Sequence, residues 1–333
     1  MRRSAAALLA VLLCGRAFAA ERPLSVVLVG WDGADRKHVE RLLKEGRLPN
    51  LAKLAAAGSL APLEVTTGST QTKPGWAEIL TGYAAARTGV LSNVDYKPIP
   101  KGWTIFERLK ARFGPEFATV FVSGKGGNVG VRGPHEICVN APHRDINHKP
   151  TNYEEKERFD GVTVDGKPPV WEKRAGEPFH DAVDAFDVHE LNAGGAKRVE
   201  GRAEAALDRV RGRRFFAFVH FADPDENGHL HGEDSKAYDD AIAGADHWTG
   251  ALLHKLDEIG LSSSTVVYVT TDHGMDAGGH QHDHAPDTFL AAGSGRQLRA
   301  GDRKDVSPTL YEEFGLSVSS AAWDPPLDGR SLR

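Results

Sequence analysis

The segment HFADPDENGHLHG, residues 220–232, places together side chains that ligate metal ions. Asp225 and His229 are four residues apart, and His231 follows two residues later. Carboxylate and imidazole groups suit zinc and similar divalent ions, which need several convergent ligands. As an isolated pair, Asp225 and His229 favour a solvated loop. The metal-site interpretation therefore depends on ligands supplied from elsewhere in the chain.

Other carboxylates and histidines also follow apolar runs that are typical of strands. Asp32 comes after LSVVLVG (24–30), and Asp272-His273 comes after STVVYVTT (264–271). Taken singly, each could be a turn or a helix cap. In open α/β sheets, however, residues beyond the carboxyl ends of parallel strands meet at one edge. We therefore expect these groups to converge, as in the two-ion centres that catalyse phosphoryl transfer.

Short apolar, β-branched runs alternate with helical patterns over most of the chain. This alternation predicts an α/β fold with a largely parallel sheet covered by helices. The expected strands are residues 24–30, 118–123, 215–221, 264–271 and 288–293, and the expected helices are 34–46, 104–114, 196–212 and 237–260. The segment 133–195 is rich in Pro, Gly, His and charge without sustained periodicity. We interpret it as an insertion, a partial lid over the sheet.

A hydroxyl group in TTGSTQTKPGWAEILTG (66–82) is a candidate nucleophile. Thr72 precedes Pro74 and Gly75, and residues 75–82 have the pattern of a short helix. The positive end of a helix dipole favours phosphate binding, and a bound metal can lower the pKa of a hydroxyl. Plain N-capping by Thr72 is the structural alternative, and the two roles are compatible.

The N-terminus predicts export. Arg2 and Arg3 precede an apolar run, and Ala17-Phe18-Ala19 offers a cleavage site, so residues 1–19 are interpreted as a signal peptide of a periplasmic or secreted protein. Residues 20–333 would then form a single domain without a transmembrane segment. Lipid anchoring at Cys14 is the minor alternative, because Leu13 is large for such a processing site.

The mature composition narrows the function further. Loss of the three arginines of the signal peptide changes the formal charge from −5 to −8, which argues against binding a nucleic-acid polymer. Only Cys138 would remain, so an intramolecular disulfide and a four-cysteine zinc site are both excluded. Any metal must be held by histidine and carboxylate.

The order of these groups resembles the alkaline phosphatase superfamily, and within it the type I phosphodiesterase/nucleotide pyrophosphatase branch. The resemblance is carried by Asp32, Thr72-Lys-Pro, Asp225-x-x-Gly-His229-x-x-Gly232, Asp272-His273-Gly and a late histidine. It covers residues 24–133 and 214–332. It implies a three-layer α/β/α sandwich of the alkaline phosphatase type.

The resemblance also implies a set of ligands for two divalent ions, expected to be Zn²⁺. One ion would be held by Asp225, His229 and His282, and the other by Asp32, Asp272, His273 and the reactive Thr72. His282 is chosen because His-x-x-Ala-Pro before a strand resembles the family's last ligand. His280 and His284 remain alternatives.

Two further residues are implied as catalytic partners. Asn93 would donate a hydrogen bond to a phosphoryl oxygen, although a turn asparagine is an equal alternative. Lys125, in VSGKGGN, could reach the same oxygen, but Gly127 stands where some phosphomonoesterases have an arginine. Sulfatases use Cys or Ser in a C/S-x-P-x-R context, so Thr72 and Trp76 count against sulfatase chemistry.

The resulting prediction is an exported, metal-dependent phosphoester hydrolase that acts on a small substrate. A metal-bound Thr72 would attack the ester and form a phosphothreonine intermediate. The alternatives are a phosphomonoesterase at the same site and a non-catalytic zinc-binding protein of the same fold. The sequence leaves the particular ester and the oligomeric state open.

Overall fold

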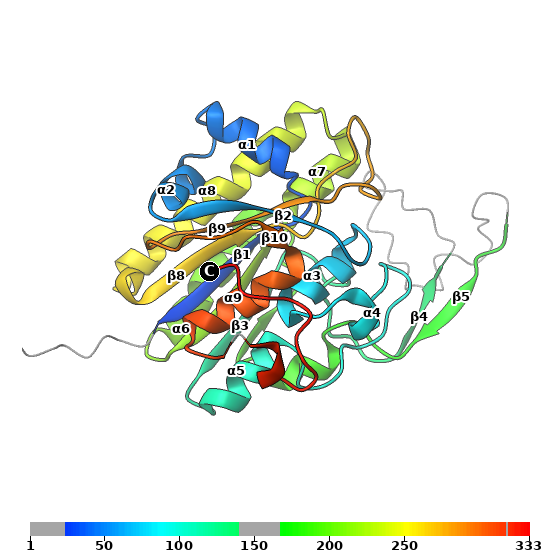
Figure 1. Ribbon diagram of the computed structural model, residues 1–333. Helices are drawn as coiled ribbons and strands as arrows, with labels where there is room; N and C mark the ends of the chain where they lie inside the picture. Colours follow the sequence, from blue (N-terminus) through cyan, green and yellow to red (C-terminus); the bar gives the residue numbers. More distant parts are fainter. Residues whose placement is uncertain (1–23, 140–166, 318) are drawn as a thin grey trace, which may run out of the picture.

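A computed structural model describes residues 24–139, 167–317 and 319–333 (Figure 1). The predicted signal peptide, residues 1–19, lies outside the described residues, as do residues 140–166 of the predicted insertion. In the described part of the chain, no helix combines the length and apolarity needed to cross a membrane.

The elements follow the expected alternation of strands and helices. The strands are β1 (Ser25–Trp31), β2 (Ser59–Glu64), β3 (Ala118–Ser123), β4 (His135–Cys138), β5 (Trp171–Arg174), β6 (Val188–Glu190), β7 (Phe215–Phe221), β8 (Thr265–Thr270), β9 (Asp287–Ala292) and β10 (Gly301–Asp302). The α-helices are α1 (Arg36–Lys44), α2 (Pro49–Ala56), α3 (Thr72–Thr81), α4 (Ala85–Thr88), α5 (Ile105–Phe113), α6 (Ala196–Val210), α7 (Asp223–His231), α8 (Lys236–Glu258) and α9 (Val306–Glu313). Short 3₁₀ helices are η2 (His180–Ala185), η3 (Ser262–Ser264), η4 (Arg303–Asp305) and η5 (Ser320–Ala322).

An eight-stranded sheet forms the centre of the fold, in the order β10-β2-β9-β8-β1-β7-β3-β6. Strand β9 runs antiparallel to both of its neighbours, and the other pairs are parallel. The expectation of a largely parallel sheet is confirmed. Because β8, β1, β7 and β3 are parallel neighbours, the segments that follow them emerge at one edge.

Alternating side chains of β1 explain why the sheet is covered on both faces. Val27 and Val29 pack into one buried cluster with α1, α2, α6 and α8. Val26 and Leu28 point the other way and pack with α3, α5 and α9. A strand that is apolar on both faces must be covered twice. The result is the predicted three-layer α/β/α sandwich, visible in Figure 1.

The described parts of segment 133–195 divide between two sheets. Strands β4 and β5 pair with each other in a two-stranded antiparallel sheet. Strand β6, near the end of the segment, instead pairs with β3 at the edge of the central sheet. The segment therefore contributes to the sandwich itself, and its role as a partial lid stays a prediction.

The segment after β7, which the sequence suggested as a loop, is the helix α7. Pro224 occupies its first turn and Gly232 ends it with a positive φ of 89°. Proline at a helix start and glycine at its end are common helix signals. The helix has no apolar stripe, because its polar residues face a site rather than a core. For that reason hydrophobic periodicity did not reveal it.

Candidate active site

Four neighbouring strands deliver polar residues to the same edge of the sheet. Asp32 directly follows β1, Asp272 follows β8, and Lys125 lies two residues after β3. Helix α7 begins two residues after β7 and carries Asp225 and His229. The remaining histidines lie in the connection from β8 to the antiparallel β9. This arrangement is the convergence that the sequence predicted.

The predicted metal ligands form two groups of three residues. The ligand atoms within each group lie within 4.8 Å of one another, and the groups are Asp225, His229, His282 and Asp32, Asp272, His273. Asp32, Asp272 and His273 are fully buried, and Asp225 and His282 are each 4% exposed. Of the three late histidines, only His282 belongs to a group in the described residues.

Backbone carbonyl groups set the tautomers of two of these histidines. His273 donates from Nδ1 to the oxygen of Gly274 at 2.8 Å, and His229 donates from Nδ1 to the oxygen of His280 at 2.6 Å. A carbonyl oxygen can only accept, so Nδ1 carries a proton in both rings, and Nε2 is the nitrogen that faces the site carboxylates. Metal-ligating histidines are held in this way. His280 thus contributes its backbone to the site.

Buried ligand atoms without a hydrogen bond provide a direct test of whether a metal fits. Asp225 Oδ1 and Asp272 Oδ2 are buried and accept no hydrogen bond among the described residues. Such atoms are costly unless a ligand satisfies them. Three carboxylates with three imidazoles match zinc or a similar divalent ion. The residues therefore fit the implied ions.

Electrostatics within the site also favour a cation. Burial and the nearby charge of Asp32 raise the pKa of Asp272 well above its usual value. Burial would also raise the pKa of Asp225, but Lys125 and His229 hold it well below the usual value. Burial and the charge of His273 lower the pKa of His282 to about 3, so its imidazole is neutral, as a metal ligand requires.

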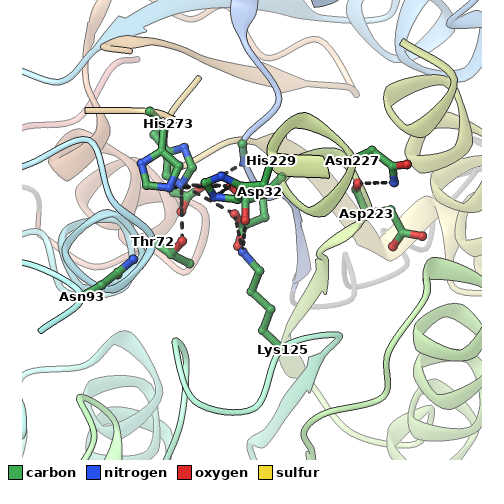
Figure 2. Close-up of polar contacts among 12 residues, drawn as sticks. Asp32, Thr72, Asn93, Lys125, Asp223, Asn227, His229 and His273 are labelled. Atoms are coloured by element: carbon green, nitrogen blue, oxygen red, sulfur yellow. Dashed lines mark hydrogen bonds and ion pairs between the residues drawn. The ribbon is translucent and has the colours of Figure 1, made fainter. Parts of the chain in front are cut away.

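Lys125 connects the two groups. Its Nζ lies 2.5 Å from Asp225 Oδ2 and 3.0 Å from Asp32 Oδ1, and its side chain is 12% exposed. Figure 2 shows the ammonium pointing into the site toward the carboxylates. The structure places the predicted phosphate-binding lysine at the site, with its ammonium on the two aspartates.

Thr72 lies beside the Asp32–Asp272–His273 group. It begins α3, is 1% exposed, and its Oγ1 is 3.4 Å from His273 Nε2 (Figure 2). Gln71, the N-cap residue, makes no side-chain capping bond. The first turn of α3 therefore presents a hydroxyl and a positive dipole end to the same place, which suits an anionic group.

Asn93 is held next to Thr72 by the backbone. Its side-chain Oδ1 accepts from the backbone amide of Lys73 at 2.9 Å, and its backbone amide donates to Gln71 Oε1 at 2.8 Å. With Oδ1 engaged, the side-chain Nδ2 is the group left to contact a ligand. The predicted site residues thus all lie together, apart from the alternatives His280 and His284.

Sequence reasoning missed several residues that hold the site in place. Arg303 and Glu78 form a fully buried ion pair, with Nε to Oε2 at 2.6 Å. Arg303 also donates to the backbone oxygens of Asp272 and Ser69, at 2.9 and 2.8 Å. It thereby joins the segment that leads into α3 and Thr72 to the segment after β8 that carries Asp272. No local pattern distinguishes such an arginine in the sequence.

His220 was also missed, although the sequence carried a signal. It stands within FFAFVHF, and a polar residue inside a buried strand demands a partner. In the structure it is fully buried and contacts Asp32 Oδ2 through Nε2 at 2.7 Å.

Comparison with solved structures agrees with the fold. A protein of the alkaline phosphatase superfamily from Vibrio parahaemolyticus superposes with a TM-score of 0.57 at 18% identity, covering 93% of this chain and 69% of that one. At this identity the likeness concerns the fold alone. The chain thus has the alkaline phosphatase-like α/β fold that the sequence predicted.

The sequence itself matches a narrower group. The family model of type I phosphodiesterases and nucleotide pyrophosphatases covers residues 26–309, and the chain belongs to this family. The predicted resemblance is confirmed. Together with the two ligand groups, the family points to dependence on divalent metal ions.

Two curated relatives share parts of the chain. Ectonucleotide pyrophosphatase/phosphodiesterase family member 1 of Rattus norvegicus is 24% identical over 237 residues, which are 70% of this chain and 22% of that protein. Steryl-sulfatase of Mus musculus is 36% identical over 114 residues, 32% of this chain and 17% of that protein. The chain spans about a fifth of the length of each relative.

Proposed function

We propose that the protein hydrolyses phosphoric esters, with a phosphodiester as substrate and Thr72 as nucleophile. The observation that carries this proposal is the position of the Thr72 hydroxyl. It lies at the start of α3, 3.4 Å from His273 Nε2 and beside an intact ligand group. The family match gives the reaction class, and the first turn of α3 gives a place for the phosphoryl group.

We assign two divalent ions, proposed to be Zn²⁺, to the two ligand groups. Asp225, His229 and His282 would hold one, and Asp32, Asp272 and His273 the other. When bound, such ions supply positive charge that acidifies a hydroxyl and neutralises the oxygens of a phosphoryl group.

The chain's own residues then account for the remaining steps. Thr72 Oγ1 gives its proton to solvent water and bonds to phosphorus, while the bond from phosphorus to the leaving alkoxide breaks and that oxygen takes up a proton from solvent water. Water then cleaves the phosphothreonine and restores the hydroxyl. Asn93 Nδ2 and Lys125 Nζ orient and neutralise the phosphoryl oxygens during both steps.

Replacement of Thr72 tests the nucleophile. We expect Thr72→Ala to bind metal at the same stoichiometry as the unmodified chain but to lose turnover of a nitrophenyl diester by at least about 10³-fold, as removal of an essential nucleophile does. Thr72→Ser should recover part of the rate. Thr81→Ala, at the other end of α3, is the matched control and should keep its activity. A Thr72→Ala protein with near-native turnover would show that another group attacks.

Two alternative substrates belong in the same assay panel. A phosphomonoester would use the same residues, and the ratio of kcat/KM for nitrophenyl diester and monoester separates the two. The identity to a steryl-sulfatase favours testing a sulfate ester in the same panel. Thr72 and Trp76 argue against that activity, so we expect the sulfate ester to be the poorest substrate.

Export forms the remaining part of the proposal. It rests on the composition of residues 1–19, with paired arginines, an apolar run and Ala17-Phe18-Ala19. N-terminal sequencing of protein recovered from the cell envelope or medium should begin at residue 20.

A further inference from the structure

A buried hydrogen-bonded relay runs behind the candidate metal site. His220, at the end of β7, contacts Asp32 Oδ2 through Nε2 at 2.7 Å and Ser123 Oγ through Nδ1 at 2.9 Å. All three side chains are fully buried. None of these contacts is needed for helix capping or for pairing within the sheet.

Sheet register brings the three residues together. Strand β7 lies between β1 and β3, and His220 is paired with Gly30 on one side and Ser123 on the other. Asp32 follows two residues after Gly30. The imidazole therefore spans the ends of two neighbouring strands.

The directions of the hydrogen bonds are fixed by elementary chemistry. The Asp32 carboxylate can only accept, so His220 carries a proton on Nε2 and donates it to Oδ2. In a ring with that one proton, Nδ1 accepts from Ser123 Oγ, which in turn accepts the backbone amide of Lys125 at 3.1 Å. The relay thus runs from Lys125 N through Ser123 and His220 to Asp32.

This relay leaves the two oxygens of Asp32 with different roles. Oδ2 accepts from His220 and, more distantly, from Trp76 Nε1 at 3.4 Å. Oδ1 lies 3.6 Å from His273 Nε2 and 3.0 Å from Lys125 Nζ, on the side of the ligand group. One oxygen is held by the protein, and the other is presented to the site.

Packing against Trp76 restricts the imidazole of His220. The indole of Trp76 meets the ring edge-to-face, with centroids 5.1 Å apart and an angle of 84°. The indole of Trp76 fills the space next to Gly30. A Cβ atom added to Gly30 would lie 2.3 Å from Cη2 of Trp76. Because Gly30 admits the indole, Trp76 can hold both His220 and Asp32.

We propose that His220, with its tautomer set by Ser123, is a positioning residue that makes Asp32 a ligand through Oδ1 alone. This inference rests on the metal site of the proposed function and deepens it. His220 touches neither substrate nor the reacting atoms. Its effect is on the orientation and basicity of Asp32, and hence on the affinity of one ion of the two.

Two amide substitutions separate the halves of the relay. A glutamine amide reaches the place of Nε2, so His220→Gln retains the donor to Asp32. An asparagine amide reaches only the place of Nδ1, so His220→Asn retains the contact with Ser123 and loses Asp32. The two variants have similar polarity, which makes each a control for the other. His220→Leu removes both contacts at similar volume.

Metal titration of the full chain is the decisive measurement. Zn²⁺ affinity is measured by competition with a chromophoric chelator, and the absorption spectrum of the Co²⁺-substituted protein reports ligand geometry. We expect His220→Asn and His220→Leu to bind one equivalent as tightly as the unmodified chain and the second about 10–100-fold more weakly, the usual effect of losing such a partner. His220→Gln should stay within about threefold, with a near-native Co²⁺ spectrum.

A second pair of variants distinguishes positioning from stability. Ser123→Ala should weaken binding of the same single metal equivalent by a few-fold, because Nδ1 of His220 is then free to take the ring proton. Thr249→Val removes a buried hydrogen bond, from Trp31 Nε1 at 3.0 Å, on the opposite face of the sheet. It should lower the unfolding midpoint but leave both metal affinities unchanged.

Several outcomes would overturn the inference. Equal affinities in His220→Gln and His220→Asn would show that the donor to Asp32 is unimportant, and this comparison stands even if His220→Leu does not fold. Weaker binding of both metal equivalents in the His220 variants would indicate general destabilisation. If the unmodified chain bound no divalent metal, the proposed function would fall with it. Normal binding by the unmodified chain and by every variant would overturn the positioning role alone.

Discussion

Lys125 illustrates how a single side chain can compensate charge in this site. Its ammonium contacts Asp225 and Asp32, which come from different strands and belong to different ligand groups. Burial would lower its pKa, but the two aspartates raise it above the usual value, so the residue is a permanent cation. A cation at this position stabilises the metal-free protein, in which three buried carboxylates lie close together.

Replacement of this lysine should therefore affect the metal-free protein most. We expect Lys125→Met to lower the stability of the metal-free chain by about 3 kcal/mol, because removing one partner leaves buried charge uncompensated. The loss should be smaller in saturating Zn²⁺, which neutralises the same carboxylates. Thermal unfolding with and without Zn²⁺ measures both values.

The control for this experiment is Lys236→Met. Lys236 pairs with Asp240 on the surface of α8 and is 84% exposed, so its replacement should change stability little in either state. An equal loss for Lys125→Met with and without metal would contradict the charge-compensation account.

At the scale of elements, helix α6 carries a titration that is separate from the site. Glu200 is 8% exposed and lies one turn before Glu204. Burial and the neighbouring Glu204 carboxylate raise the pKa of Glu200 to about 7, from a usual value near 4.5. The folded state therefore prefers the protonated form of Glu200. Its contribution to stability is present below about pH 4.5 and is lost as the pH rises through 7.

Glu200→Gln should remove this dependence. We expect the variant to unfold at a higher temperature than the unmodified chain at pH 8, and the difference to shrink toward zero at pH 5. Unfolding midpoints measured at both pH values test the sign. Glu116→Gln, at an exposed position between α5 and β3, is the control and should show no such trend. A gain that is equal at the two pH values would rule out the Glu200 titration as its cause.

The elements differ in how well the sequence predicts them, for physical reasons. β1, β3, β7, β8 and β9 were predictable because each is a buried apolar run. Helix α7 was not predictable, because its buried residues, Pro224, Asp225 and Gly228, form no apolar stripe. The strand β6 has three residues and gains its stability from pairing with β3, which no local pattern records.

At the scale of the whole molecule, the site depends on the order of the strands. Asp32 and Asp272 are 240 residues apart in the sequence and adjacent in space because β1 and β8 are paired. The types of the ligands and their places after strands were visible in the sequence. The partners of His220, Arg303 and Glu78 were not visible, because they are fixed only when the sheet order is known; for His220 the sequence signalled only that some partner was needed. Likewise, only the position of His282 within a ligand group distinguishes it from His280 and His284.

The same geometry would couple the stability of the fold to bound metal. The ligands lie after β1 and β8, on α7, and on the connection before β9, so bound ions would join segments from both ends of the chain. An ion that binds only the folded state stabilises it by about 2.7 kcal/mol at a hundred times its Kd. Without ions, Lys125 is the cation that directly contacts Asp32 and Asp225.

Removal of metal should therefore destabilise the native state and loosen one segment first. We expect a chelator to lower the unfolding midpoint, and proteolysis to become faster in residues 274–286, which contact α7 in part through His229, His280 and His282. Added Zn²⁺ should restore both properties, with a midpoint that rises with its concentration. His229→Ala should bind less metal and respond less to the chelator. If the midpoint and the cleavage pattern were the same with chelator and with Zn²⁺, the two ligand groups would be a structural cluster of polar residues rather than a metal centre.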